Sequence, residues 1–181
     1  NGVVSCGSIM VPCPWFREAA DLARANPHLD LGVHLTLNAE WPSYRWGPVA
    51  GRDRVPSLLD EQGYLPRTLL EVLRAAKPEH VEIELRAQIE TALAAGIDVT
   101  HLDSHMGTVL LDPFVGIYAK LAQEYRLPVF AAHPDPALLE RAGFGSARKR
   151  MGQFYLYDLS VLKVMFTAVV TALLGVTYLA W

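Results

Sequence analysis

Histidine and carboxylate side chains are concentrated in residues 100–105, which read Thr-His-Leu-Asp-Ser-His. Five of these six residues are polar, although apolar stretches precede and follow them. His101, Asp103 and His105 combine imidazole with carboxylate, the donors that zinc and other divalent transition metals prefer, whereas magnesium prefers oxygen ligands. The segment is therefore a candidate metal site.

The spacing of these residues allows more than one geometry. If the strand ends at Leu102 and the chain stays extended, His101, Asp103 and His105 project alternately to one side. If the chain turns helical, His101 and His105 lie one turn apart, as in bis-histidine zinc sites. A third interpretation has no metal: a polar loop in which Asp103 or Ser104 caps the following helix.

His34 is a second candidate, near the end of a predicted buried strand whose residues 31–37 read Leu-Gly-Val-His-Leu-Thr-Leu. A buried imidazole needs a hydrogen-bond partner, because an unpaired buried polar group costs about 1–3 kcal/mol. Taken alone, such a histidine is more often structural than a ligand. Thr36 lies two residues later, on the same side of an extended strand, so that the two side chains could line one pocket.

The segments that must position these residues alternate between strand and helix patterns. Strands are predicted at residues 2–11, 29–37, 97–102 and 127–132, and helices at residues 14–25, 79–95 and 113–125. The second helix is the clearest, since apolar residues recur every four positions from Val81. This alternation predicts parallel strands joined by crossover helices, in an open sheet or a barrel. The active sites of such folds lie at the carboxyl ends of the strands, where both candidate segments fall.

Residues 40–68 interrupt this pattern with an irregular stretch that contains Trp41, Tyr44, Trp46 and four prolines. A long irregular insertion is either a lid or substrate-binding loop, or a structural excursion packed by its own aromatic residues.

The glycine-rich phosphate-binding motifs and the GxSxG nucleophile motif are absent from the sequence.

The composition narrows the classes of protein. The 181 residues have a net charge of −3 and are 51% hydrophobic, which is globular and excludes a disordered chain. The slightly acidic balance argues against electrostatic binding of nucleic acid. Two cysteines, Cys6 and Cys13, fit a reduced, cytoplasmic protein rather than a disulfide scaffold. The length predicts a single domain over residues 1–181.

Residues 164–181 carry no charge, which reaches the length of a transmembrane helix. Alternatively, residues 159–174 form a buried helix, Gly175 ends it, and residues 176–179 form a buried strand. Lys163 lies within the apolar block and no cluster of basic residues flanks it. We therefore expect the helix and strand rather than a membrane span.

The two histidine motifs together resemble a known family. Residues 32–37 (Gly-Val-His-Leu-Thr-Leu) and 100–105 resemble the internal signatures of the YdjC-like (ChbG-type) carbohydrate deacetylases, and residues 1–11 resemble that family's second strand. The resemblance implies a (β/α) barrel-like α/β fold, here a distorted or incomplete TIM-type barrel. It also implies a hydrolase with a divalent metal ion, magnesium or zinc, that removes acetyl groups from N-acetylated sugars.

The resemblance assigns roles by motif position. His34 and His105 would be metal ligands, and Asp103 and His101 would be catalytic residues close to the metal. Family members begin with a strand that ends in Asp-Asp, which supplies a third ligand and the catalytic base, and they carry a His-Pro motif near the C-terminus. The sequence lacks both at the expected places, so we expect the native protein to contain pieces that are missing here.

Other functions stay open at this point. The same metal site could serve a hydrolase or lyase with a different substrate, or the chain could be a non-catalytic α/β binding protein with structural histidines. A membrane-anchored form depends on residues 164–181. The expected partner is an acetylated sugar, with no nucleic acid and no membrane, and a homodimer is left open.

Overall fold

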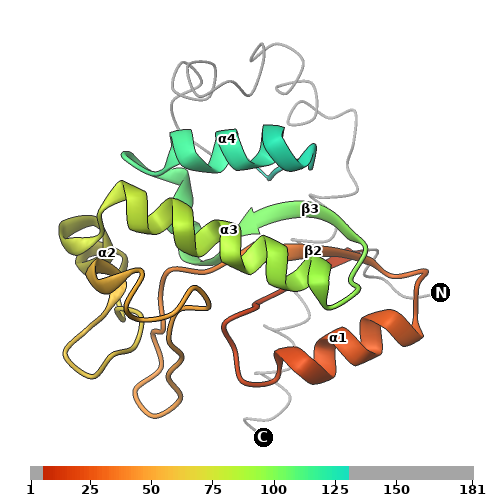
Figure 1. Cartoon of the computed structure of the whole chain (residues 1–181), viewed down its shortest axis with the longest axis horizontal. Helices are drawn as coiled ribbons and strands as arrows, with labels where there is room; N and C mark the ends of the chain where they lie inside the picture. The colour runs from red at the N-terminus through yellow and green to blue at the C-terminus, as the bar shows by residue number, and fades with distance from the viewer. Residues whose placement is uncertain (1–5, 131–181) are drawn as a thin grey trace, which may run out of the picture. The chain divides into compact units, whose positions relative to one another are not determined.

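The computed structural model describes residues 6–130, which contain a parallel three-stranded sheet (Figure 1). The strands are β1 (Cys6–Ile9), β2 (Asp30–Leu35) and β3 (Val99–Ser104), in the order β1-β2-β3. Both neighbouring pairs are parallel, as the alternation of strands and helices predicted. The α/β fold with parallel strands is therefore confirmed over these residues.

The strand predicted at residues 127–132 is represented, in the described part of the chain, by one parallel bridge between Val129 and Leu102. The backbone N–H of Leu102 donates to the carbonyl of Pro128, and the carbonyl of Leu102 accepts from the N–H of Phe130, both at 3.0 Å. This segment therefore lies beside β3, on the side opposite to β2.

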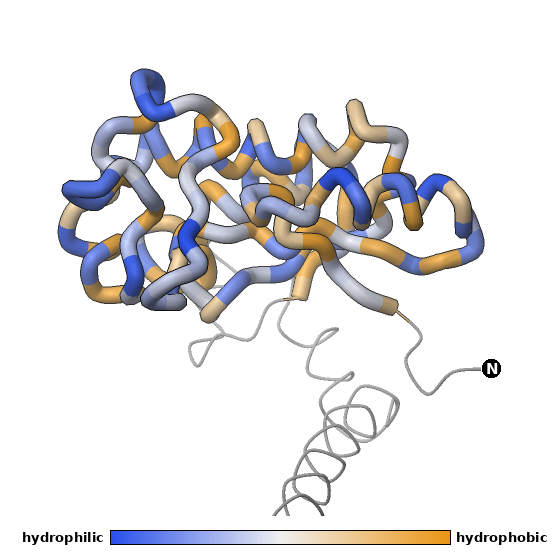
Figure 2. The backbone as a smooth tube through the Cα atoms, turned by 90° about the horizontal axis from the view of Figure 1, so that it is seen from below, coloured by the Kyte–Doolittle hydropathy of each residue, from blue (hydrophilic) through white to orange (hydrophobic). Residues whose placement is uncertain are grey.

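Three longer helices form where hydrophobic periodicity predicted them: α1 (Phe16–Ala25), α3 (Pro78–Ala94) and α4 (Val115–Tyr125). Helix α3 contacts both β2 and α4 (Figure 1). Hydrophobic and hydrophilic residues alternate along the helical segments (Figure 2), as expected for helices that bury one face. The short helix α2 (Leu69–Ala75) was not predicted, although Thr68 and Glu71 form a capping box at its start.

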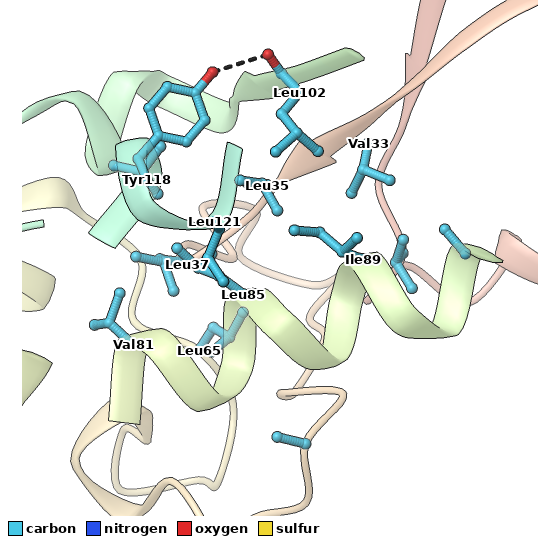
Figure 3. Close-up of a cluster of buried hydrophobic side chains, with 14 of the residues drawn as sticks. Val33, Leu35, Leu37, Leu65, Val81, Leu85, Ile89, Leu102, Tyr118 and Leu121 are labelled. Carbon is cyan, nitrogen blue, oxygen red and sulfur yellow. Dashed lines mark hydrogen bonds between the residues drawn. The ribbon is translucent and has the colours of Figure 1, made fainter. Parts of the chain in front are cut away.

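The hydrophobic core lies between β2 and α3 (Figure 3). Val81, Leu85 and Ile89 recur along one face of α3 and are fully buried, together with Val33 and Leu35 of β2. Fully burying one such side chain is worth about 1.5–3 kcal/mol, so this contact fixes the helix across the sheet. The strand that carries His34 is thereby held on one face.

A buried polar pair on α3 also holds the chain that follows β2. The carboxylate of Glu84 accepts hydrogen bonds from the N–H groups of Val49 and Ala50 at 3.0 and 2.9 Å. Gln88 bonds both the N–H and the carbonyl of Thr36, at 2.9 and 2.7 Å, and also donates to Glu84. Burial raises the pKa of Glu84, although its three hydrogen bonds act in the opposite direction. Residues 36–50 are therefore attached to α3 at two points.

The irregular stretch at residues 40–68 is packed at its base. Trp46, Leu58 and Leu65 are buried, and Leu58 belongs to the 3-10 turn η1 (Pro56–Leu58). The N–H of Leu65 donates to the carbonyl of Trp46 at 3.1 Å, which ties the two ends of the stretch together. Trp41 and Tyr44, by contrast, are exposed. The stretch is therefore a structured insertion that presents aromatic side chains at its tip.

Two predictions fall outside the described residues: the helix at residues 159–174 and the strand at residues 176–179. The single domain over the whole chain likewise stays a prediction. Within residues 6–130, no helix combines the length and the apolar character needed to cross a bilayer.

Candidate active site

The carboxyl ends of the three strands bring together side chains that are far apart in the sequence. β1 contributes Ser8, β2 contributes His34 and β3 contributes Asp103. In the parallel register, Ser8 pairs with Gly32, and His34 lies directly opposite Asp103. The sheet thus places one histidine of the first motif against the carboxylate of the second.

Asp103 is hydrogen-bonded through both of its oxygens. Its Oδ1 lies 2.8 Å from Nδ1 of His34, and its Oδ2 accepts a hydrogen bond from the hydroxyl of Ser8 at 2.8 Å. The same hydroxyl oxygen lies 3.3 Å from Nδ1 of His34. The interpretation in which Asp103 caps the next helix is therefore wrong, since no side-chain cap is present there and the carboxylate points at His34 instead.

His105 begins a tight turn directly after β3. The 3-10 segment η2 (His105–Leu110) contains Met106 and Gly107 with φ of 54° and 70°, which is left-handed backbone. The helical geometry considered for residues 101–105 is wrong, because pairing with β2 keeps the chain extended as far as Ser104. The turn directs His105 toward His34, with the two ring centroids 5.3 Å apart.

Glu40, which sequence reasoning did not identify, completes the cluster. Its Oε2 lies 2.9 Å from Nε2 of His105. Partial burial acts to raise the pKa of Glu40, but hydrogen bonds from His105, its own backbone and Trp41 lower it on balance. The alternation of β2 does not lead to Glu40, because the strand ends at Leu35 and the next alternate residues, Thr36 and Asn38, are fully buried.

The two carboxylates decide where the protons of the two neutral imidazoles lie. A carboxylate only accepts, so Asp103 places the proton of His34 on Nδ1, and Glu40 places that of His105 on Nε2. The remaining nitrogens, Nε2 of His34 and Nδ1 of His105, then have free lone pairs and face each other at 3.3 Å. Two facing lone pairs form a site for a cation.

His101 lies apart from this cluster. Its Nδ1 is 2.9 Å from the hydroxyl of Thr100 and 3.7 Å from Oδ1 of Asp30. Its ring occupies the space beside Gly32, where an added Cβ would lie 2.5 Å from ring atoms. No contact joins it to His34, Asp103 or His105 among the described residues. The structure therefore brings together three of the four predicted site residues and places the fourth nearer the start of β2.

The neighbouring residues have structural roles. Thr36 is fully buried and donates to the carbonyl of His34 at 2.6 Å, so it does not line a pocket with that histidine. Trp46 is also buried, donates to the carbonyl of Asn38 at 2.8 Å, and has its ring centroid 6.4 Å from that of His105. Thr36 thus bonds the backbone of His34, and Trp46 packs beside the ring of His105.

The donor set of the imidazole pair fits a divalent metal ion. Two nitrogens that each lie about 2.0–2.1 Å from a tetrahedral zinc ion are about 3.3 Å apart, which matches the separation found here. Histidine ligands whose other nitrogen donates to a carboxylate are usual in metal sites. Within residues 6–130, however, no group of three or more histidine, cysteine or carboxylate side chains is arranged to hold a metal ion. The imidazole pair therefore offers two nitrogen donors, fewer than a complete metal site needs.

Comparison with known families identifies the chain. The family model described as "YdjC-like protein" matches residues 1–176. The chain belongs to the YdjC-like protein family. The resemblance of the two histidine motifs to this family is thereby confirmed.

Curated relatives of this YdjC-like chain are named carbohydrate deacetylase. The protein of Thermus thermophilus is 44% identical over 121 residues, covering 67% of this chain and 42% of the relative. The protein of Thermoanaerobacter pseudethanolicus is 30% identical over 155 residues, covering 86% of this chain and 60% of the relative. The chain thus spans about half the length of the curated relatives that it matches.

A solved structure shares the fold of this YdjC-like chain. It is a protein of Enterococcus faecalis V583, provisionally named a cellobiose-phosphate cleavage protein, with a TM-score of 0.66 and 33% sequence identity. The match covers 74% of this chain and 50% of that protein. The parallel α/β arrangement therefore recurs in an experimentally determined structure.

Proposed function

We propose that this YdjC-like chain is the metal-binding part of a carbohydrate deacetylase, which hydrolyses the acetamide group of N-acetylated sugars. The observation that carries the proposal is the pair of imidazole nitrogens 3.3 Å apart, each belonging to a ring that a carboxylate orients. The relatives named carbohydrate deacetylase support the choice of reaction. The fold shared with a larger structure supports the parallel α/β arrangement, and a (β/α) barrel for the whole protein is part of this proposal.

In this proposal, His34 and His105 hold a divalent ion through Nε2 and Nδ1. Imidazole donors favour zinc over magnesium, although the carboxylates nearby leave magnesium as the alternative. Once bound, the ion would polarise the acetyl carbonyl and lower the pKa of a bound water molecule. Asp103 holds the proton on Nδ1 of His34, so that Nε2 keeps its lone pair, and Ser8 fixes the orientation of that carboxylate.

The contacts in the structure support a role at the site for Asp103 more than for His101. Asp103 contacts His34, a proposed metal ligand, and would act by orienting that ring. His101 contacts Thr100 and Gly32 instead, so its role in the reaction stays a prediction. The cytoplasmic location and the homodimer stay predictions as well.

The exposed aromatic residues suit a sugar substrate. Trp41 and Tyr44 are 59% and 41% exposed, and the ring of Tyr44 lies 6.0 Å from that of Trp46, which in turn packs near His105. Aromatic rings at a polar site offer flat apolar surfaces on which the apolar face of a sugar ring can stack. We propose that these two side chains bind the sugar beside the imidazole pair.

The test measures metal binding and acetate release with the protein that contains this chain. Zinc affinity is measured by calorimetry after chelation, and acetate release is followed with N-acetylglucosamine oligomers. His34→Ala and His105→Ala should each lose more than about 100-fold in zinc affinity and all measurable activity, whereas His28→Ala, an exposed histidine, should retain both. Undiminished zinc binding in both site variants would overturn the assignment. Zinc binding without acetate release would indicate a metal hydrolase with another substrate.

A further inference from the structure

The carboxylate of Glu40 stands in the same relation to His105 as that of Asp103 to His34. The distances are 2.9 Å for Glu40 and 2.8 Å for Asp103. We propose that Glu40 is a positioning residue, which holds the proton of His105 on Nε2 and thereby keeps the Nδ1 lone pair directed at His34. The proposal rests on the metal site proposed above, but the state of His105 can be measured without any metal.

The position of the proton matters because the two rings compete for it. Nε2 of His34 has a free lone pair and lies 3.3 Å from Nδ1 of His105. Without a carboxylate at Nε2, His105 would place its proton on Nδ1 and donate it to His34, since two facing lone pairs repel each other. A hydrogen bond from Nδ1 of His105 to Nε2 of His34 would then occupy both nitrogens, and neither could bind a metal ion. Glu40 prevents this by accepting the proton at the opposite side of the ring.

Partial burial makes this contact more than a surface ion pair. The side chain of His105 is 14% exposed and that of Glu40 is 30% exposed. A hydrogen bond to a charged group in such surroundings contributes more than a typical exposed ion pair does. The hydrogen bond to Glu40 is therefore strong enough to make the Nε2–H tautomer of His105 the main one.

The backbone around Glu40 is fixed independently of the imidazoles. The N–H of Ala39 donates to the carbonyl of Pro66 at 2.8 Å, and the carbonyl of Asn38 accepts from the indole of Trp46 at 2.8 Å. Both Asn38 and Ala39 are fully buried. The carboxylate thus approaches His105 from a rigid support, which is what a positioning residue requires.

The experiment determines the tautomer of His105 in the metal-free chain at mildly alkaline pH. Protein with 15N-labelled histidine gives long-range 1H–15N correlations that distinguish a proton on Nε2 from one on Nδ1. We expect the Nε2–H form in the unsubstituted protein and a shift to the Nδ1–H form in Glu40→Ala. Glu40→Gln should restore much of the Nε2–H form, because the amide oxygen can accept the same proton. Glu61→Ala, which removes an exposed carboxylate from the same insertion, should leave the tautomer unchanged.

Zinc affinity gives a second readout on the same variants. Glu40→Ala should weaken zinc binding about 10- to 100-fold, as the loss of a carboxylate partner of a histidine ligand does elsewhere, with Glu40→Gln between it and the unsubstituted protein. Glu61→Ala should bind zinc normally. An unchanged tautomer in a folded Glu40→Ala protein would overturn the role of Glu40. A shifted tautomer in a protein that never binds zinc would instead uphold that role and overturn the proposed metal site.

Discussion

β2 and β3 carry histidine–carboxylate neighbours at both of their ends, and the two ends differ in what they can bind. At the carboxyl end, His34 and His105 each contact a carboxylate at less than 3 Å and direct their free nitrogens at each other. At the other end, His101 lies 3.7 Å from Asp30, whose side chain is 54% exposed. Both ends of the strands thus have a histidine beside a carboxylate. Only at the carboxyl end, among the described residues, do two imidazole rings point their free nitrogens at each other.

Removing each carboxylate charge tests this difference most strongly. Asp103→Asn should lower zinc affinity about 10- to 100-fold, because the amide no longer gives His34 a charged acceptor. Asp30→Asn should change it less than about twofold, since a 3.7 Å separation in an exposed pair contributes little. Calorimetric titration with zinc measures both. Equal losses in the two variants would show that the two ends do not differ as described.

Gly32→Ala tests whether His101 is a packing residue. The added Cβ would lie 2.5 Å from the ring of His101 and 2.6 Å from its carbonyl oxygen. Overpacking of this kind should lower the free energy of unfolding by about 1–3 kcal/mol, measured by denaturant titration. Combining Gly32→Ala with His101→Ala should recover part of the loss, because the ring is removed while the carbonyl remains.

The single variant His101→Ala provides the functional half of that test. Its zinc affinity should stay within about twofold of the unsubstituted protein, as expected for a residue outside the ligand set. A loss as large as that of His34→Ala would place His101 at the metal and contradict the separation of the two ends.

A smaller effect on stability than that of Gly32→Ala is expected at Glu84, which holds the chain that follows Glu40. Glu84→Gln turns an amide N–H toward one of the backbone N–H groups of Val49 and Ala50, so one hydrogen bond is lost. The free energy of unfolding should fall by about 1 kcal/mol. Zinc affinity should decrease with it, while the environment of His101 stays unchanged by NMR.

This effect should depend on pH in a defined direction. The pKa of Glu84 is raised in the folded protein, so the folded state keeps its proton at pH values where the unfolded state has lost it. The stabilisation from that proton is complete below the ordinary pKa of 4.5 and is lost as the pH rises through the raised value. Glutamine does not titrate, so the difference in unfolding free energy between the two proteins should narrow with rising pH. A widening difference would contradict the raised pKa.

Periodicity and motif spacing predicted the parallel α/β fold and the meeting of His34, Asp103 and His105. The position of His101 beside Gly32, apart from that cluster, was not predicted, and the pairing of β2 with β3 has a register irregularity nearby, between Leu31 and Val33. Such a bulge shifts neighbouring side chains relative to the simple two-residue alternation. The two-residue alternation of the sequence gives no sign of such a shift, so it could not be predicted.

Ser8 and Glu40 escaped prediction for a different reason. Glu40 lies in a stretch without periodicity, and its contact with His105 depends on the left-handed turn at Met106 and Gly107. Ser8 meets Asp103, 95 residues later in the chain, because β1 and β3 both pair with β2. Both contacts are products of the tertiary fold, and no local propensity encodes them.

The exposed residues 41–44 are a place where the sequence can change while the fold is kept. The two ends of this segment are fixed, by the bond of Ala39 to Pro66 on one side and by the ion pair of Arg45 with Asp60 on the other. A substitution of Tyr44 is thus accommodated at the surface without displacing Glu40 or the imidazoles, whereas the side chain of Trp41 also hydrogen-bonds the carboxylate of Glu40. Under the proposed sugar-binding role, relatives that act on different sugars are expected to differ at Tyr44, and directed evolution of specificity is best begun there.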